Sequence, residues 1–173
     1  MEDATPAARE AVSSIAELLE PQGQRKGHPL RAGPGALPQP VRVVFDTNIF
    51  VSALILPGGR ADAALAHVIE GTDRLILSKP ILDELLGVLA RKFSRDREEL
   101  ARLAVWLAEL AEWVRPTRRL SVAAEEADNR ILECALAGRA EVIVTGDQGL
   151  LQLGSCEGIR ILTLKEYLSK RNE

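Results

Sequence analysis

The sequence predicts a three-layer α/β/α domain, in which helices cover both faces of a central parallel sheet. Short β-rich runs alternate with helical patterns from Val41 to the end of the chain. This alternation is typical of parallel strands joined by crossover helices. The length of 173 residues suits one such domain with an extension, because a chain of this size buries a single substantial core.

The extension is predicted at the N-terminus, in two parts. In residues 6–20 five apolar residues recur at helical spacing, which indicates a short amphipathic helix: Ala8, Val12, Ile15, Leu18 and Leu19. Residues 21–40 contain five prolines and four glycines and are therefore predicted to be a flexible linker. We expect a leader over 1–40 and the folded domain over 41–173. Either the helix docks elsewhere or the leader has no structural role, and the sequence leaves both open.

The elements of the domain follow from β-rich runs, helical periodicity and end signals. Strands are predicted at residues 41–45, 73–78, 111–116, 140–146 and 159–163. Helices are predicted at residues 61–69, 80–92, 96–110 and 125–137. Ser78 with Pro80 forms a helix start, and Gly71 and Gly138 are helix stops.

Composition excludes several classes of protein. The net charge is -3, and residues 41–173 alone carry 18 basic and 20 acidic residues, so this is no basic nucleic-acid-binding surface. No apolar run reaches the roughly 20 residues of a membrane span, and the acidic N-terminus lacks a signal core, so we expect a soluble cytoplasmic protein without membrane association. Cys134 and Cys156 match neither a disulfide framework nor a zinc site and are expected to be reduced thiols.

Two aspartates are predicted at the ends of buried strands. Asp46 ends the first strand within a nearly continuous apolar run, and Asp147 follows the fourth strand one residue after Gly146. In an open α/β sheet the functional crevice lies at the carboxyl ends of the strands, where the strand order reverses. If the first and fourth strands are neighbours, the two carboxylates face each other.

Two more acids are placed by helical-wheel positions. Asp128 falls on the buried stripe of helix 125–137, whereas Glu126 and Glu133 fall on its wet side. Glu84 falls on the border of the apolar stripe of helix 80–92, with Gly87 one turn on leaving room beside it. An aspartate in a first helical turn usually complements the helix dipole, but that does not explain one that points inward.

A cluster of these acids would require cations, because like charges at close range repel strongly. Carboxylate oxygens select hard ions, Mg²⁺ or Mn²⁺, over zinc. The usual chemistry of such a site is metal-assisted phosphodiester hydrolysis. Bound cations would also let a mildly acidic protein hold a phosphate backbone.

Four segments then resemble the PIN-domain ribonucleases, in particular the VapC-like toxins of prokaryotic toxin–antitoxin pairs. The segments are VVFDTNIFVSALI, SKPILDELLGVL, DNRILECALAGRAEVIVTGDQGLLQL and IRILTLKEYL, in the order of that family. The resemblance implies a PIN-like domain with a parallel five-stranded sheet, Mg²⁺- or Mn²⁺-dependent endoribonuclease activity, a homodimer and an antitoxin partner. It carries the family's four acids onto Asp46, Glu84, Asp128 and Asp147.

The same matching suggests supporting roles for two polar residues. Asn48 would hydrogen-bond a metal ligand or a water, and Thr145 would orient the last acid; alternatively, Asn48 only caps a helix and Thr145 only ends a strand. The apolar surface of residues 103–110 is a candidate dimer interface.

RNA contacts are predicted from the basic residues Arg115, Arg118 and Arg119. The basic segment 91–102, which includes Arg91, is a second candidate for phosphate contacts, but a solvated helix face with i,i+4 ion pairs is the preferred interpretation. The alternative function is an RNA- or partner-binding module without turnover. A haloacid-dehalogenase-type phosphatase is set aside, because it needs an aspartate where Asn48 stands.

Overall fold

The computed structural model describes residues 40–171. The predicted leader helix and most of the linker lie outside the described residues. The strands are β1 (Arg42–Phe45), β2 (Arg74–Ser78), β3 (Glu112–Val114), β4 (Val142–Val144), β5 (Ser155–Cys156) and β6 (Ile159–Leu162). The helices are α2 (Thr47–Ile55), α3 (Arg60–Ile69), α4 (Lys79–Phe93), α5 (Arg97–Leu110), α6 (Glu126–Ala137), α7 (Gln148–Leu153) and α8 (Leu164–Arg171).

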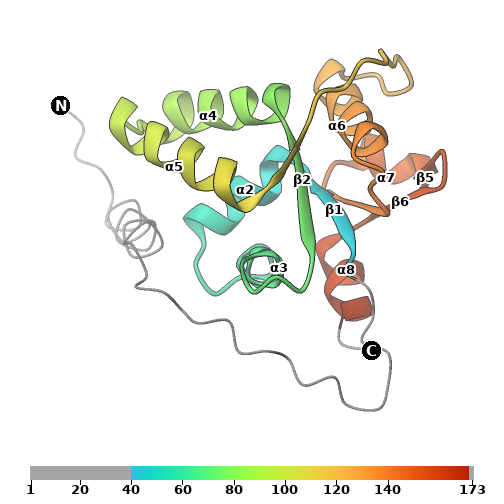
Figure 1. The fold of residues 1–173 in the computed structure, drawn as a ribbon, viewed down its shortest axis with the longest axis horizontal. Helices are drawn as coiled ribbons and strands as arrows, with labels where there is room; N and C mark the ends of the chain where they lie inside the picture. The colour runs from blue at the N-terminus through green and yellow to red at the C-terminus, as the bar shows by residue number, and fades with distance from the viewer. Residues whose placement is uncertain (1–39, 172–173) are drawn as a thin grey trace.

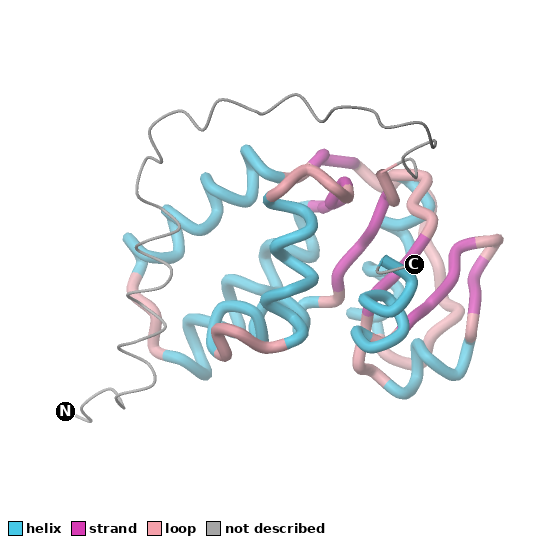
Figure 2. Tube along the Cα trace, turned by 90° about the horizontal axis from the view of Figure 1, so that it is seen from below, coloured by secondary structure: helices cyan, strands magenta, loops and turns pink. Residues whose placement is uncertain are grey.

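The described strands form one sheet in the order β3-β2-β1-β4-β6-β5, with helices on both of its faces (Figures 1 and 2). All five predicted strands are present and pair in parallel. The two-residue β5 adds an antiparallel edge to β6. The predicted α/β/α fold is confirmed. The expected adjacency of the first and fourth strands is also confirmed, because β1 pairs with β4 through Val43, Val44 and Phe45.

The four predicted helices correspond to α3 to α6, and local signals explain their ends. Asp96 caps α5 in a capping box with Glu99. Gly138 ends α6 where a side chain would collide with β2, because a Cβ there would lie 2.3 Å from Ile76 Cγ2. Helices α2, α7 and α8 are not among the predicted helices. Helix α2 follows β1 immediately, so its start is concealed within one apolar run.

The core lies between the sheet and its helices, and two predictions about it are wrong. Glu133 is only 4% exposed, because it accepts a hydrogen bond from Leu120 N at 2.8 Å and pairs with Arg130. Leu103 and Leu107 are buried in the core of the domain, so these two residues of the surface expected at 103–110 are not available to a partner. Val105, at 60% exposure, is an exception.

The described residues contain no single helix that is long and apolar enough to cross a membrane. Helices α2 and α3 meet the criteria of length and composition only as a pair, and this pair is bent by 101°.

Candidate active site

Asp46 and Asp147 meet at the carboxyl ends of the neighbouring strands β1 and β4. Asp46 is buried directly after β1, and its amide donates to Val144 O at 3.0 Å. Thr145 Oγ1 donates to Asp46 Oδ2 at 2.6 Å and accepts from Asp147 N at 3.0 Å. The fully buried Thr145 therefore orients Asp46, across the two strands, rather than the carboxylate of the following Asp147.

The carboxyl group of Asp46 experiences opposing effects. Burial raises the pKa of Asp46 above its ordinary value, and the charge of Asp147 adds to this rise. The hydrogen bonds from Thr145 and from the backbone amides of Asn48 and Thr47 act to lower it. The pKa of Asp46 is raised on balance, so these hydrogen bonds stabilise its carboxylate less than burial and the charge of Asp147 destabilise it.

Asp128 reaches the same place from the first turn of α6, as its wheel position predicts. Its carboxyl group is hydrogen-bonded to that of Asp147. Burial raises the pKa of Asp128 to about 7, together with the charge and hydrogen bond of Asp147 and the charge of Asp46. The neighbouring negative charges therefore favour the protonated form of Asp128 where no cation is bound.

Asp147 also has a local structural role, as the N-cap of α7. Its Oδ1 accepts from Leu150 N at 2.9 Å. A Cβ added at Gly149 would lie 3.0 Å from this oxygen and 3.7 Å from Asp128 Oδ2. The glycine thus leaves the space beside the two carboxylates open.

Glu84 is half-buried on α4. It is linked to the other acids through Thr47, a residue that was not predicted to belong to the site. Thr47 Oγ1 donates to Glu84 Oε2 at 3.3 Å. Thr47 is 3% exposed and directly follows Asp46, whose carboxylate its amide also reaches. The signal that could have identified Thr47 is its place inside the DTN motif, where a buried hydroxyl needs a partner.

Asn48 differs from its predicted role. It is exposed, and it approaches Asp46 through its backbone amide. Within residues 40–171 its side chain makes no hydrogen bond to the acids.

The oxygen atoms of the four acids suit a hard cation, although the acids do not form a preassembled metal site. All four side chains offer oxygen ligands, and a cation among them would offset the charges that raise the pKa of Asp128. In the described part of the chain, no three His, Cys, Asp or Glu side chains are close enough together to hold a metal ion. Binding of Mg²⁺ or Mn²⁺ would therefore have to draw the carboxylates inward.

The three arginines predicted to bind RNA are separated by the fold. Arg115 directly follows β3, at the carboxyl edge of the sheet that carries the acids. Arg118 binds both carboxylate oxygens of Glu157 at 2.8 Å, in the turn before β6. Because β6 runs parallel to β4, this turn lies at the opposite edge. Arg119 is exposed in the same loop.

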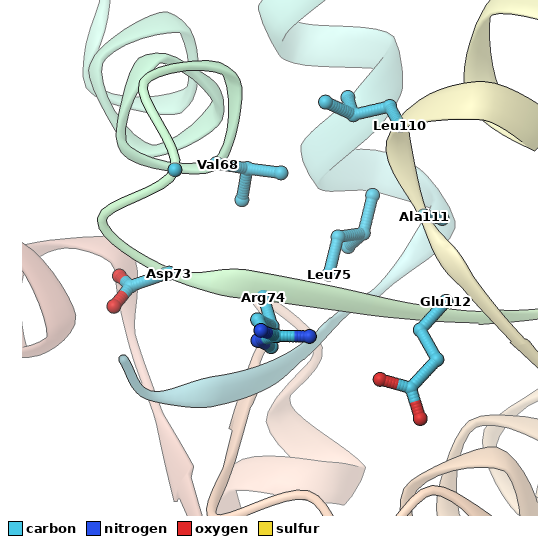
Figure 3. A pocket seen from close by; sticks show the side chains of 8 residues that line it. Val68, Asp73, Arg74, Leu75, Leu110, Ala111 and Glu112 are labelled. Carbon is cyan, nitrogen blue, oxygen red and sulfur yellow. The ribbon is translucent and has the colours of Figure 1, made fainter. Parts of the chain in front are cut away.

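A hollow of about 370 Å³ lies away from the acids, at the amino ends of β2 and β3. Figure 3 shows Val68, Leu75 and Leu110 pointing toward one another across it. Asp73 at its rim is engaged by Arg171 and Tyr167. The hollow lacks converging groups free for chemistry, so the acids at the carboxyl edge are the stronger candidate site.

Comparisons with known proteins agree with the fold. The PIN domain family matches residues 42–149. An uncharacterized protein of Methanocaldococcus jannaschii is 29% identical over 117 residues, which are 65% of this chain and 75% of that protein.

Two solved structures are also similar. The crystal structure of VapBC2 from Rickettsia felis, bound to a DNA fragment from their promoter, has a TM-score of 0.52 at 16% identity and covers 71% of this chain and 98% of that chain. The PIN domain of T. brucei RRP44 has a TM-score of 0.42 at 14% identity and covers 79% and 83%. Because the family match spans more than half of the chain and includes all four predicted acids, the protein belongs to the PIN domain family.

Proposed function

We propose that this protein is a divalent-metal-dependent endoribonuclease that hydrolyses RNA phosphodiester bonds. The observation that carries the proposal is the convergence of Asp46, Asp128 and Asp147 at one strand edge. The charge of Asp147 raises the pKa of both Asp46 and Asp128, and no Lys or Arg among the described residues pairs with these three acids. Membership of the PIN domain family supports nuclease chemistry at this position.

The proposed metal is Mg²⁺ or Mn²⁺, held by Asp46, Glu84, Asp128 and Asp147. When bound, such an ion lowers the pKa of a water molecule and stabilises the leaving oxygen. In this scheme Thr145 and the amides of Thr47 and Asn48 orient Asp46, and Thr47 orients Glu84. The cation would also offset the negative charges of Asp147 and Asp46 that raise the pKa of Asp128.

The proposed partners are an RNA substrate and a cognate antitoxin. The similarity in fold to VapBC2 motivates the role of a toxin in a toxin–antitoxin pair. Of the predicted RNA contacts, Arg115 is the best placed, because it lies at the same carboxyl edge of the sheet as the acids. Arg118 instead forms an ion pair with Glu157, and Arg119 is its neighbour in the chain.

We further propose that the protein acts in the cytoplasm as a homodimer. The exposed side chains of Val105 on α5 and Trp113 on β3 supply apolar surface for such contacts. Light scattering coupled to gel filtration would measure the oligomeric state directly.

Cleavage of single-stranded and structured RNA in Mg²⁺ or Mn²⁺ tests the proposed activity. Asp46→Asn and Asp128→Asn should each lower the rate by at least about 100-fold, because each removes a charge required by the cation. EDTA should abolish cleavage. Activity that persists in EDTA, or that survives both substitutions, would contradict the proposal.

A second candidate function is RNA or partner binding without turnover. It is favoured by one observation: in residues 40–171 the acids do not stand close enough to form a preassembled metal site. Metal-dependent RNA binding without any cleavage would support this second function and reject the first.

A further inference from the structure

Helix α4 carries Arg91 on the same face as Glu84. Residues 84, 87 and 91 are three and four positions apart and therefore lie in one row along the helix. Because α4 begins directly after β2, its first turns lie at the carboxyl edge of the sheet, and Thr47 ties Glu84 to this edge. The row thus leads from the acids along the surface of α4.

Gly87 lets the Arg91 side chain fold back along this row. A Cβ at Gly87 would lie 2.9 Å from Arg91 Nη1, 3.6 Å from Cζ and 3.7 Å from Nη2. The guanidinium group therefore covers the backbone of Gly87, only about 4.5 Å of helix rise from the level of Glu84. Side chains on a helix lean toward its N-terminus, which favours this direction.

The surroundings of Arg91 do not account for its position. Of the basic residues near it, Arg95 pairs with Glu99 at 3.7 Å and Arg102 pairs with Glu98, whereas Lys92 and Arg97 have no ion pair within residues 40–171. Arg91 is exposed and makes no ion pair within residues 40–171. A cation in the last turn of a helix usually complements the dipole, but this guanidinium points away from the helix C-terminus.

We propose that Arg91 binds a backbone phosphate of the RNA next to the phosphate held at the acids. The inference rests on the proposed function, because it assumes that RNA lies across the carboxyl edge. A guanidinium fork binds a phosphate through two parallel hydrogen bonds, which suits an exposed arginine beside a site of phosphodiester hydrolysis. Gly87 keeps the guanidinium close to the helix and near Glu84.

Four variants test this contact against a general charge effect. Arg91→Ala removes the group, and Arg91→Lys keeps the charge but loses the fork. Gly87→Ala displaces the guanidinium while the arginine stays in the chain. Lys92→Ala is the matched control, because Lys92 is an exposed cation next to Arg91 but on a different face of α4. Cleavage kinetics use a fluorescein-labelled single-stranded RNA of mixed sequence in Mn²⁺, and equilibrium binding uses the same RNA in the Asp46→Asn background.

Arg91→Ala should weaken RNA binding about 5- to 10-fold and raise KM similarly, with kcat within about 2-fold of wild type. The slope of log Kd against log salt should fall by about 0.7, the contribution of one phosphate contact on a single strand. Arg91→Lys should recover only part of the affinity. Gly87→Ala should weaken binding about 3-fold while raising the melting temperature, because alanine favours a helix over glycine.

Two results would overturn the inference while leaving the proposed function intact. In the first, wild type cleaves the RNA and Arg91→Ala binds and cleaves as wild type does. In the second, Lys92→Ala weakens binding as much as Arg91→Ala. If wild type neither binds nor cleaves RNA in Mn²⁺, both the inference and the proposed function are wrong.

Discussion

Buried acids have different partners at the amino edge of the sheet, where the parallel strands begin, and at the carboxyl edge, where they end. At the amino edge, Asp73 accepts from Val41 N at 3.1 Å, from the hydroxyl of Tyr167 and from Arg171 at 2.9 Å. At the carboxyl edge, Asp46 and Asp128 are also buried, but their neighbours are hydroxyl groups, amides and another carboxylate. Among the described residues, a cation pairs with the buried acid at the amino edge, and none pairs with the buried acids at the carboxyl edge.

This contrast separates a structural carboxylate from one that is proposed to act in catalysis. A buried charge with a partner holds elements together: Asp73 joins the start of β1 to α8. Buried acids without a cation cost stability, which a protein retains only where an external ligand repays it. Substitution at the two edges should therefore have effects of opposite sign.

The largest expected effect on stability is at Asp73. Asp73→Asn should destabilise the protein by about 3 kcal/mol, because it leaves Arg171 buried without its counter-charge. Asp128→Asn should instead stabilise the metal-free protein at pH 8 by about 1 kcal/mol, since the amide donates to Asp147 without a charge. Urea unfolding in EDTA measures both changes. A loss of stability for Asp128→Asn similar to that for Asp73→Asn would remove the distinction between the two edges.

The acids should also make the metal-free protein sensitive to pH. In the folded state Asp128 keeps its proton up to about pH 7, whereas in the unfolded chain an aspartate releases it near its ordinary pKa of about 3.9. The folded state therefore binds more protons between these values, so stability should fall as the pH rises from about 4 to 7 and then level off. The full shift corresponds to about 4 kcal/mol, and solvent screening reduces the expected fall to about 2 kcal/mol.

Urea unfolding in EDTA across this range measures the fall. Mn²⁺ should reverse it at pH 8, and Asp128→Asn should flatten the profile. A profile that is the same for wild type and Asp128→Asn would mean that this carboxyl group does not titrate as described.

The sequence was sufficient to predict the acids that stand at strand ends and on the apolar stripe of a helix. Asp46 and Asp147 follow from the rule for parallel strands, and the inward position of Asp128 follows from a wheel count. These depend on local periodicity, which a single sequence displays. The link from Thr47 to Glu84 joins residues 37 positions apart, and no local pattern reports such a contact.

The errors have the same origin. Glu133 appeared solvent-facing on the wheel, but the loop before α6 folds over it and uses its carboxylate for Leu120 N. Leu103 and Leu107 appeared available for a dimer because the position of α5 against the domain was unknown. Where tertiary packing decides burial, periodicity gives only the side of an element and not what covers it.

A smaller effect is expected from the buried hydroxyl group at the carboxyl edge. Thr47→Val keeps the volume but frees Glu84, so Mn²⁺ affinity should fall about 10-fold, as is common when a partner of a metal ligand is lost. Thr47→Ser restores the hydroxyl and should bind Mn²⁺ within about 2-fold of wild type. Isothermal titration calorimetry measures these affinities. Equal affinity for wild type and Thr47→Val would show that Glu84 does not depend on this bond.

The smallest effect is expected at Arg118, which lies at the amino edge of the sheet. Its ion pair with Glu157 is exposed, and such pairs contribute little, so Arg118→Ala should leave the stability nearly unchanged. It should also leave RNA affinity nearly unchanged, whereas Arg115→Ala, at the edge of the acids, should weaken binding by a few-fold. Fluorescence anisotropy with one labelled RNA compares the two. If Arg118→Ala weakened binding more than Arg115→Ala, the RNA would have to extend around the domain to the amino edge, and substrate binding would no longer belong to the carboxyl edge alone.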